Sequence, residues 1–457
     1  MKPKMTPQEK KQTLQLFLVT TVLLIMGILV IWHGDNLSNR GDAMRSVTGA
    51  HLSARGIAVP TPLLFSVRDI PVSGQSFPIM ALTSIRCAND LCSLHGSVHI
   101  LDTSPVISGM AVLHASPAMP IVLYHDISNL KAAVCMDANC MSATLHVLDT
   151  GIASGYDTDP VSAVLDPTGK PIIAYYDAGN QDLKVAHCVD VQCSSATKTT
   201  VDSDGNTGMM PVILMGSNHL PIIFYKRTTG TGSTAFDSVV VAACTNLDCT
   251  TTPTSAPDIF NIQTGHGNKV GPYIAAVLGP NGWPWVAIYA GDYGGGRPLV
   301  IHCTSPTCNA SSGIPNTHIV LGTALDDGRY PAILIGEDGL PIIFYQLVLG
   351  FINGISYGYN LKTAHCLNAD CAQVIITHFP NTELFGYYLA VGRNPVTGSI
   401  LVIGQNSHNQ SADSDLFAMN CTDSTCSQMT PPIIIDDPAT PPTDIDHKAM
   451  ANAMFFL

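Results

Sequence analysis

The chain has 457 residues, of which 46% are hydrophobic and only 12% charged, with 38 glycines and 31 prolines. This composition excludes an intrinsically disordered chain and favours many short strands joined by tight turns. The formal net charge of −13 excludes an extended phosphate-binding surface, so we expect no nucleic-acid partner.

A stretch of nineteen residues without a charge, 14–32, follows four lysines near the N-terminus. At about 1.5 Å per residue, a helix of this length approaches the ~30 Å hydrocarbon core of a bilayer. The lysines place residues 1–13 in the cytoplasm by the positive-inside rule. A cleaved signal peptide is the alternative, but no small-x-small cleavage site closely follows the apolar run. We therefore expect a single-pass type II signal-anchor, with residues 33–56 as a stalk.

All fourteen cysteines fall into seven pairs of the form C-x-x-x-x-C, and the first cysteines of successive pairs are 48 to 63 residues apart. The pairs are Cys87/Cys92, Cys135/Cys140, Cys188/Cys193, Cys244/Cys249, Cys303/Cys308, Cys366/Cys371 and Cys421/Cys426. A repeat of this length fits four short strands, so residues 57–457 are predicted to form an all-β, seven-bladed β-propeller. A repeat architecture accommodates this length in a single domain.

The third unit shows the pattern of a blade most clearly. A turn at 166–170 precedes the apolar strand 171–177, and a third strand, 183–188, leads into the first cysteine. A last β-branched run, 197–201, follows the second cysteine. The strand at 171–177 recurs in most units and opens with proline, which a strand tolerates at its first residue.

The first unit lacks a clear first strand, although residues 62–67 match the second strand of the other units. After the seventh unit, residues 447–457 remain, at the distance where a further first strand would begin. We expect residues 449–457 to pair as the missing innermost strand of the first blade. This exchange would close the ring and remove exposed sheet edges.

Each cysteine pair is predicted to form a disulfide that joins the third strand of a blade to the fourth. A four-residue loop can bring two Cβ atoms within disulfide range, whereas a zinc half-site, which typically has two to four intervening residues, needs a second half nearby, and here each pair has a blade to itself. Disulfides require an oxidising compartment, so we expect the propeller to lie outside the cytoplasm, in the periplasm or on a cell, virion or envelope surface.

One segment offers a weak calcium site. Asp202, Asp204 and Asn206 place oxygen donors at alternate positions, without the downstream bidentate glutamate of an EF-hand loop. These oxygens could equally serve turns, and apart from calcium we expect no metal and no cofactor.

The connection between the second and third strands is long in four units, at 226–237, 290–297, 346–360 and 405–415. Long loops on a rigid scaffold often carry binding residues, although these could also be tolerated insertions. The candidate binding residues are Asp177, Arg227, Asp292, Tyr293, Arg297, Tyr357 and Tyr359. Their aromatic and polar groups suit contact with a glycan or a protein.

The repeat P-I-I-x-Y-Y-D…D-L-K-V-A-H-C-x-x-x-x-C, as in residues 171–193, resembles secreted or surface β-propeller proteins and is distantly similar to the sialidase-like superfamily. The resemblance covers residues 57–457 and implies the propeller fold. The Asp-box S-x-D-x-G-x-x-W of sialidases is missing, and no arginine triad can be assigned. The resemblance therefore implies no catalytic residue.

H-E-x-x-H does not occur in the sequence, and the one G-x-S-x-G match, 354–358, lies inside the long connection 346–360 and is not followed by a helix pattern, so neither common hydrolase signature is supported. The sequence therefore favours a membrane-anchored recognition module, not an enzyme, whose long-loop face binds a glycan or protein. A carbohydrate-active hydrolase or lyase of propeller fold is the alternative, because many Asp could approach one another in the fold. A structural surface or virion component is the third hypothesis.

Overall fold

The computed structural model describes residues 51–52, 58–59, 61–70, 79–115, 119–152, 160–231, 235–251, 257–263, 269–291, 296–309, 317–321, 327–348, 351–352, 355–356, 359–379, 385–406, 416–435 and 452–456. The predicted cytoplasmic tail, 1–13, and transmembrane segment, 14–32, lie outside these ranges. Within the described ranges, no helix has the length and apolar character needed to cross a bilayer. The chain divides into two compact units, Met1–Arg45 and Ser46–Leu457, and all described residues belong to the second.

The second unit is a seven-bladed β-propeller, and each blade is an antiparallel sheet of four strands. Blade 1 contains β32 (Asn452–Phe456), β3 (Pro62–Ile70), β4 (Ile79–Cys87) and β5 (His95–Ser104). Blade 2 contains β6 (Ile107–Ala115), β7 (Met119–Asp126), β8 (Asn129–Cys135) and β9 (Ala143–Thr150). Blade 3 contains β10 (Ser162–Leu165), β11 (Pro171–Asp177), β12 (Asp182–Cys188) and β13 (Ala196–Asp202).

The remaining four blades continue the same order from the inside outward. Blade 4 contains β14 (Asn206–Met215), β15 (Pro221–Thr229), β16 (Phe236–Ala243) and β17 (Asp258–Gln263). Blade 5 contains β18 (Lys269–Leu278), β19 (Pro284–Gly291), β20 (Arg297–His302) and β21 (Thr317–Val320). Blade 6 contains β22 (Asp327–Ile335), β23 (Pro341–Val348), β26 (Tyr359–Cys366) and β27 (Val374–Phe379). Blade 7 contains β28 (Phe385–Arg393), β29 (Ile400–Asn406), β30 (Leu416–Asn420) and β31 (Ile433–Ile435).

Two short antiparallel pairs lie outside the blades. β1 (His51–Leu52) pairs with β2 (Ala58–Val59), so the last part of the predicted stalk carries a strand. β24 (Phe351–Ile352) pairs with β25 (Ile355–Ser356) in the long connection between β23 and β26.

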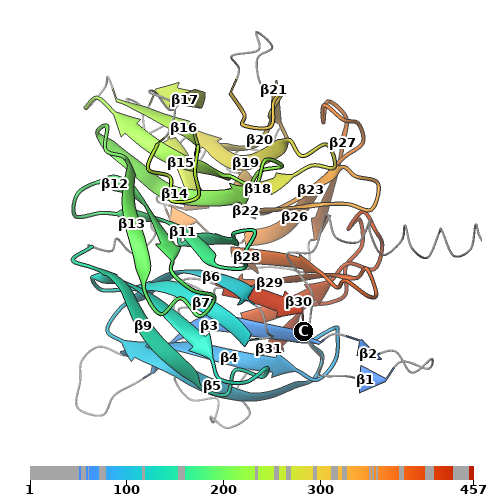
Figure 1. Cartoon of the computed structure of the whole chain (residues 1–457). Helices are drawn as coiled ribbons and strands as arrows, with labels where there is room; N and C mark the ends of the chain where they lie inside the picture. The colour runs from blue at the N-terminus through green and yellow to red at the C-terminus, as the bar shows by residue number, and fades with distance from the viewer. Residues whose placement is uncertain are drawn as a thin grey trace, which may run out of the picture. The chain divides into compact units, whose positions relative to one another are not determined.

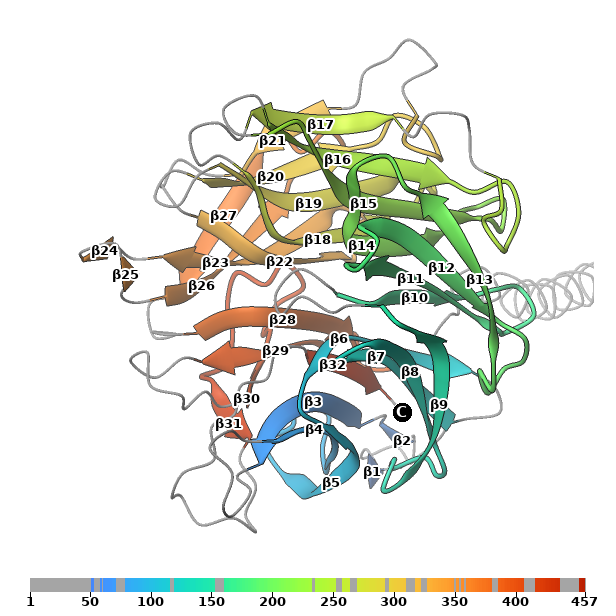
Figure 2. The same cartoon turned by 90° about the vertical axis from the view of Figure 1, so that its left-hand side faces the viewer.

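The blades form a closed ring. Each innermost strand contacts the innermost strand of the next blade, in the order β32, β6, β10, β14, β18, β22 and β28, and β28 contacts β32 again. Figures 1 and 2 show the blades following one another from blue through green and yellow to red. Blade 1 combines strands from both ends of the repeat region, because β32 pairs with β3 from Pro62 opposite Phe456 to Ser66 opposite Asn452.

Burial in the strands follows their position in the blade. The second strand lies between two neighbouring blades, and all seven residues of β11 are buried. The outermost strand is the most exposed, and in β9 only Leu148 and Asp149 are buried. A strand that is covered on both faces needs a continuous apolar run, which explains the Pro-Ile-Ile pattern of the second strands.

All seven predicted cysteine pairs form disulfides, with Cα–Cα distances of 4.7 to 4.9 Å. The pairing within each C-x-x-x-x-C motif is therefore confirmed. The disulfides are Cys87–Cys92, Cys135–Cys140, Cys188–Cys193, Cys244–Cys249, Cys303–Cys308, Cys366–Cys371 and Cys421–Cys426.

The position of the second cysteine corrects one part of the prediction. We expected each disulfide to join the third strand of a blade to the fourth, but in every pair the second cysteine lies in the loop before the fourth strand begins. These residues are Cys92, Cys140, Cys193, Cys249, Cys308, Cys371 and Cys426. The expectation that each disulfide joins the third strand to the fourth is therefore wrong.

The geometry of the turn explains why these cysteines stay outside the fourth strand. The backbone N–H of each second cysteine donates to the carbonyl oxygen three residues earlier, at 2.9 to 3.3 Å. The φ angle of each is between 49° and 56°, in the left-handed region that a strand does not adopt. The disulfide therefore closes the turn that follows the third strand and does not crosslink two paired strands.

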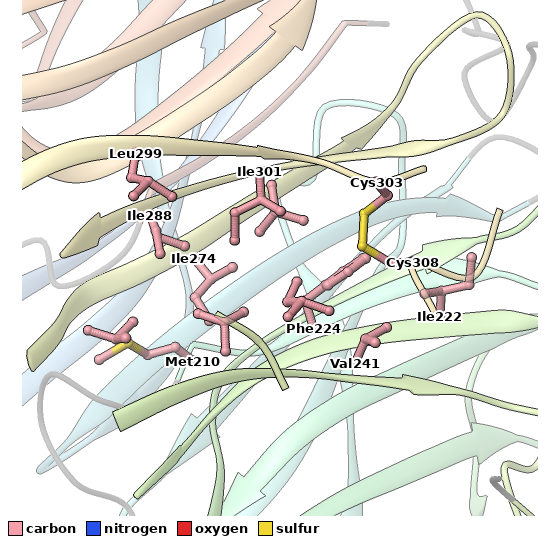
Figure 3. Close-up of a cluster of buried hydrophobic side chains, with 14 of the residues drawn as sticks. Met210, Ile222, Phe224, Val241, Ile274, Ile288, Leu299, Ile301, Cys303 and Cys308 are labelled. Atoms are coloured by element: carbon pink, nitrogen blue, oxygen red, sulfur yellow. A yellow bond between two sulfur atoms is a disulfide. The ribbon is translucent and has the colours of Figure 1, made fainter. Parts of the chain in front are cut away.

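Each disulfide also packs into the apolar core that its blade shares with the preceding one, a role that the sequence did not indicate. Figure 3 shows this between blades 4 and 5, where the Cys303–Cys308 disulfide lies near Phe224, Val241 and Ile301. The cysteine hairpins therefore fix a turn within each blade and fill the space between blades.

Replacing Cys188 and Cys193 together with alanine is expected to lower the free energy of unfolding by about 3 kcal/mol or more. Loss of the crosslink contributes about 2 kcal/mol for so short a loop. Loss of two buried sulfur atoms beside Ile121 and Leu123 of blade 2 adds a packing term. Urea unfolding of the variant and the wild type measures the difference. A loss of about 2 kcal/mol or less would show that the sulfur atoms add nothing to the contact between blades.

Candidate functional site

The innermost strands of blades 4 to 7 carry an irregularity at the same place. In β22, Arg329 is opposite Gln346 and Ala332 is the next paired residue, opposite Phe344. Two residues of the inner strand therefore face one residue of the second strand. Similar shifts occur in β14, β18 and β28. Such bulges redirect side chains and often lie beside functional sites.

One residue in each of these bulges has a left-handed backbone. They are Met210, Tyr273, Tyr330 and Tyr388, with φ of 54°, 71°, 50° and 48°. Thirteen non-glycine residues in the described part of the chain have positive φ, and the others are the second cysteine of each pair and two turn residues, Gln181 and His219. A left-handed tyrosine costs on the order of 1–3 kcal/mol, and such strain is concentrated at functional sites.

The three tyrosines of the bulges meet although they come from three different blades. The ring centroids of Tyr330 and Tyr388 are 5.0 Å apart. Tyr273 lies 5.4 Å from Tyr330 and 5.6 Å from Tyr388. Because these residues belong to innermost strands, the cluster lies at the centre of the ring. All three side chains are half-buried, so part of the cluster faces solvent. We call Tyr273, Tyr330 and Tyr388 the axial tyrosine cluster.

The cluster makes the centre of the ring asymmetric. The position of these tyrosines is found in other blades by counting back along the innermost strand from the turn that leads into the second strand. It holds Pro160 in blade 3 and Gly109 in blade 2. Tyrosine therefore occupies this position in blades 5 to 7, methionine in blade 4, proline in blade 3 and glycine in blade 2, where Gly109 also has a left-handed φ of 52° at a register shift. The long connections predicted from the sequence belong to blades 4 to 7, so they lie on the side of the cluster.

Two of the predicted binding residues are held in ion pairs. Asp177 is buried, its Oδ2 atom lies 3.5 Å from Lys184 Nζ, and the same oxygen accepts a hydrogen bond from Asn180 Nδ2. Arg227 Nη2 donates to Asp258 Oδ1 at 2.7 Å. These contacts give both residues a structural role within the blades.

The other predicted binding residues are described only in part. Arg297 begins β20 and its side chain is exposed. Tyr359 begins β26, and its side chain lies outside the described set. Asp292, Tyr293 and Tyr357 lie outside the described residues.

The oxygen atoms of the predicted calcium segment have partners in the protein. Asp202 Oδ2 accepts hydrogen bonds from Tyr225 Oη at 2.6 Å and from Thr207 Oγ1 at 2.9 Å. Asn206 Oδ1 accepts a hydrogen bond from Tyr176 Oη at 2.7 Å. These oxygens join blade 4 to blade 3.

A cation already lies beside the two carboxylates of this segment. Arg227 Nη1 is 3.8 Å from Asp202 Oδ2 and 3.9 Å from Asp204 Oδ2. In the part of the chain that the structure describes, no group of three or more His, Cys, Asp or Glu side chains is arranged to hold a metal. Calcium at this segment stays a prediction, and the guanidinium argues against it.

Three consecutive blade junctions share one hydrogen bond. The carboxylate that ends an outermost strand accepts from a buried tyrosine in the second strand of the next blade, at 2.6 to 2.7 Å. The pairs are Asp102–Tyr124, Asp149–Tyr175 and Asp202–Tyr225. Burial and the neighbouring carboxylate raise the pKa of each tyrosine, so the phenols remain protonated donors.

Asp149→Asn is expected to destabilise the protein at pH 7 by about 1–3 kcal/mol, because Tyr175 and Lys184 lose a charged acceptor. Burial raises the pKa of Asp149, but hydrogen bonds from Lys184 and Tyr175 outweigh it and hold the pKa below 3.8. The carboxylate therefore stabilises the fold fully above its ordinary pKa, and this contribution is lost as pH falls through the lowered value. The difference between variant and wild type should shrink below about pH 4.

Urea unfolding at pH 7 and pH 3 measures this effect. Asp204→Asn is the matched control, because the Asp204 side chain is 86% exposed. The control should change the free energy of unfolding by less than about 0.5 kcal/mol. An Asp149→Asn variant as stable as that control at pH 7 would contradict the role assigned to the junction.

Sequence reasoning missed the axial tyrosine cluster. A signal was present, because a Gly-x-Tyr triplet recurs at 271–273, 328–330 and 386–388. Each triplet lies at a similar distance before its second strand. The glycine is required by close packing: at Gly328, with φ of 102°, an added Cβ would lie 2.5 Å from Pro298.

The sequence matches no protein-family model and no curated protein. The structure resembles an ulvan lyase of a polysaccharide lyase family, with TM-score 0.49 and 10% identity, over 79% of this chain and 93% of that chain. The polysaccharide lyase Uly1 aligns with TM-score 0.43 and 9% identity, over 83% and 100%. An α-L-arabinanase from Penicillium chrysogenum aligns with TM-score 0.41 and 13% identity, over 66% and 89%.

The comparison with solved structures bears on the expectation that this chain is a recognition module without catalytic activity. The three solved structures are glycan-processing enzymes, and others that the chain resembles are a Bacillus subtilis arabinanase and a Bacteroides thetaiotaomicron xylanase. These neighbours go against the expectations that the chain binds without catalysis and is more likely not an enzyme, and they favour the hydrolase or lyase alternative. The likeness extends to the fold alone, so a reaction has to be argued from residues of this chain.

Proposed function

We propose that this protein is a carbohydrate-active hydrolase or lyase whose site is the axial tyrosine cluster. The observation that supports this most is the left-handed backbone shared by Tyr273, Tyr330 and Tyr388 at bulges of three adjacent inner strands. Three strained tyrosines that meet at the centre of a propeller need a reason beyond packing. Gly109, Pro160 and Met210 occupy the same position in blades 2 to 4, so the fold itself does not require an aromatic ring there.

Tyrosine suits work on a glycan in two ways. Its ring offers a flat apolar surface and its hydroxyl a hydrogen-bonding group, so it combines contact area with orientation of a ligand. Its phenol can also transfer a proton to or from a reacting group. Side chains from three blades around one centre could hold a sugar ring from several directions, which a single loop cannot do.

The proposal also includes the cellular setting. Seven disulfides indicate an oxidising, extracytoplasmic environment. The uncharged segment 14–32 would hold the propeller at a membrane, so that it acts on a glycan outside the cytoplasm. The distant similarity of the repeat to sialidase-like propellers supplies no catalytic residue for this reaction.

A polysaccharide screen tests the proposal. The purified full-length protein is incubated with neutral and acidic polysaccharides, and new reducing ends and the size of the products are measured. We expect at least one polymer to be cleaved by the wild type. A lack of cleavage across a broad panel, from protein that remains folded, would contradict an enzymatic function.

A further inference from the structure

Four cations of blades 2 to 4 are already paired with carboxylates. Lys184 Nζ lies 2.6 Å from Asp149 Oδ2 and 3.5 Å from Asp177 Oδ2. Lys226 Nζ lies 2.7 Å from Asp237 Oδ2. Lys131 and Arg227 are held in the same way. Their partners are Asp102 and Asp126 for Lys131, and Asp258 for Arg227.

These pairs are poorly accessible. The side chains of the four cations are between 11% and 17% exposed. The side chains of Asp177 and Asp237 are only 2% and 3% exposed. An acidic sugar that recruited Lys184 or Lys226 would leave a buried carboxylate without its cation, which is strongly unfavourable. These lysines are therefore not available to bind an anionic ligand.

Two further arginines belong to blades 5 and 6, which contribute Tyr273 and Tyr330 to the cluster. Arg329 precedes Tyr330, but its side chain is 9% exposed and its guanidinium lies over the ring of Tyr289, 6.0 Å from the centroid. Arg297 is exposed at the start of β20. The net charge of the region opposes the binding of an anion at these arginines, because residues 14–457 contain 17 basic and 33 acidic residues. A surface with this excess repels polyanions.

We infer that the glycan cleaved at the axial tyrosine cluster is neutral, without uronate or sulfate groups, and that it is cleaved by hydrolysis. This inference rests on the proposed function. Elimination by a lyase needs a sugar carboxylate beside the proton that is removed, so a neutral glycan excludes it. In hydrolysis the glycosidic C–O bond breaks, water gives its hydroxyl to the anomeric carbon and its proton ends on the leaving oxygen. No oxidant or cofactor is needed.

A comparison of neutral and acidic polymers tests the inference on the full-length protein. Arabinan, xylan and galactan are the neutral probes, and polygalacturonate and alginate are the acidic ones. Reducing ends report any cleavage, and ultraviolet absorbance of an unsaturated uronate reports elimination. We expect cleavage of a neutral polymer at least about 100-fold faster than of any acidic one, as differential transition-state binding would give.

The outcomes separate the inference from the proposed function. Cleavage of an acidic polymer with the absorbance of an unsaturated product would overturn the inference and leave the enzymatic function standing. Cleavage of no polymer would overturn both. A salt series adds a second test: kcat/KM on the neutral polymer should change less than about twofold, because no surface ion pair with the substrate is screened. A steep fall with added salt would contradict a neutral binding mode.

Discussion

Tyr330→Ala is expected to lower kcat/KM for glycan cleavage by at least about 100-fold, the size of effect typical for a lost acid–base or positioning group. The side chain contacts both Tyr273 and Tyr388 at the centre of the ring, so its removal takes away one wall of the site. Tyr330→Phe separates two roles of the residue. If the phenol transfers a proton, Phe should be as inactive as Ala, whereas a stacking role alone would leave Phe active.

The control for this prediction lies on the opposite face of the ring. Met136 belongs to the cysteine hairpin of blade 2 and its side chain is 63% exposed. Met136→Ala should retain wild-type kcat/KM. Equal losses in Met136→Ala and Tyr330→Ala, or full activity in the latter, would contradict the assignment of the site.

A stability comparison tests the backbone strain separately from activity. Tyr330→Gly should be more stable than Tyr330→Ala by about 1 kcal/mol, because glycine adopts a positive φ without steric cost. At an ordinary strand position the order would be reversed. The same comparison at Tyr388, with φ of 48°, should give the same sign.

Deletion of residues 448–457 is expected to prevent cooperative folding, or to lower Tm by at least about 10 °C. The deletion removes β32, which is the innermost strand of blade 1 and contacts the innermost strands of blades 2 and 7. β3 would then present an unpaired edge at the centre of the ring. Circular dichroism during heating and the yield of folded protein measure the effect.

Deletion of residues 1–45 is the matched control, because they form a separate compact unit. This variant should keep the Tm of the wild type. A C-terminal deletion that melts with the wild type would show that the ring does not depend on β32.

Much of the fold could be predicted because its signals are local and repeated. The cysteine pairs set the length of the blade, and the apolar strands that open with proline set the position of the second strand. With both in hand, the gap before Pro62 and the surplus residues after Ile435 indicated the pairing seen between β3 and β32. Repetition makes a missing strand visible, since the one unit that lacks it differs from the six units that have it.

The exact place of each disulfide was harder to predict than its pairing. The spacing of Cys135 and Cys140 indicates that they can bond, but it does not show where the fourth strand starts. That start depends on the left-handed turn at the second cysteine, and β9 begins only at Ala143. A backbone conformation of this kind leaves no mark in the hydrophobic pattern of the strands.

The site could not be predicted by the same route, because it depends on contacts between blades. Tyr273, Tyr330 and Tyr388 are far apart in sequence, and only the ring brings them together. The predicted binding residues include Asp177 and Arg227, which the structure places in ion pairs. Charge and position in a loop did not reveal that these groups already have partners.

The crystal structure of the Tyr330→Phe protein with an oligosaccharide from a cleaved polymer tests the central claim most directly. The account predicts a neutral sugar ring in contact with Tyr273 and Tyr388 at the centre of the ring, on the side of blades 5 to 7. A sugar bound only at the outer strands or at the cysteine hairpins, away from these two residues, would contradict it.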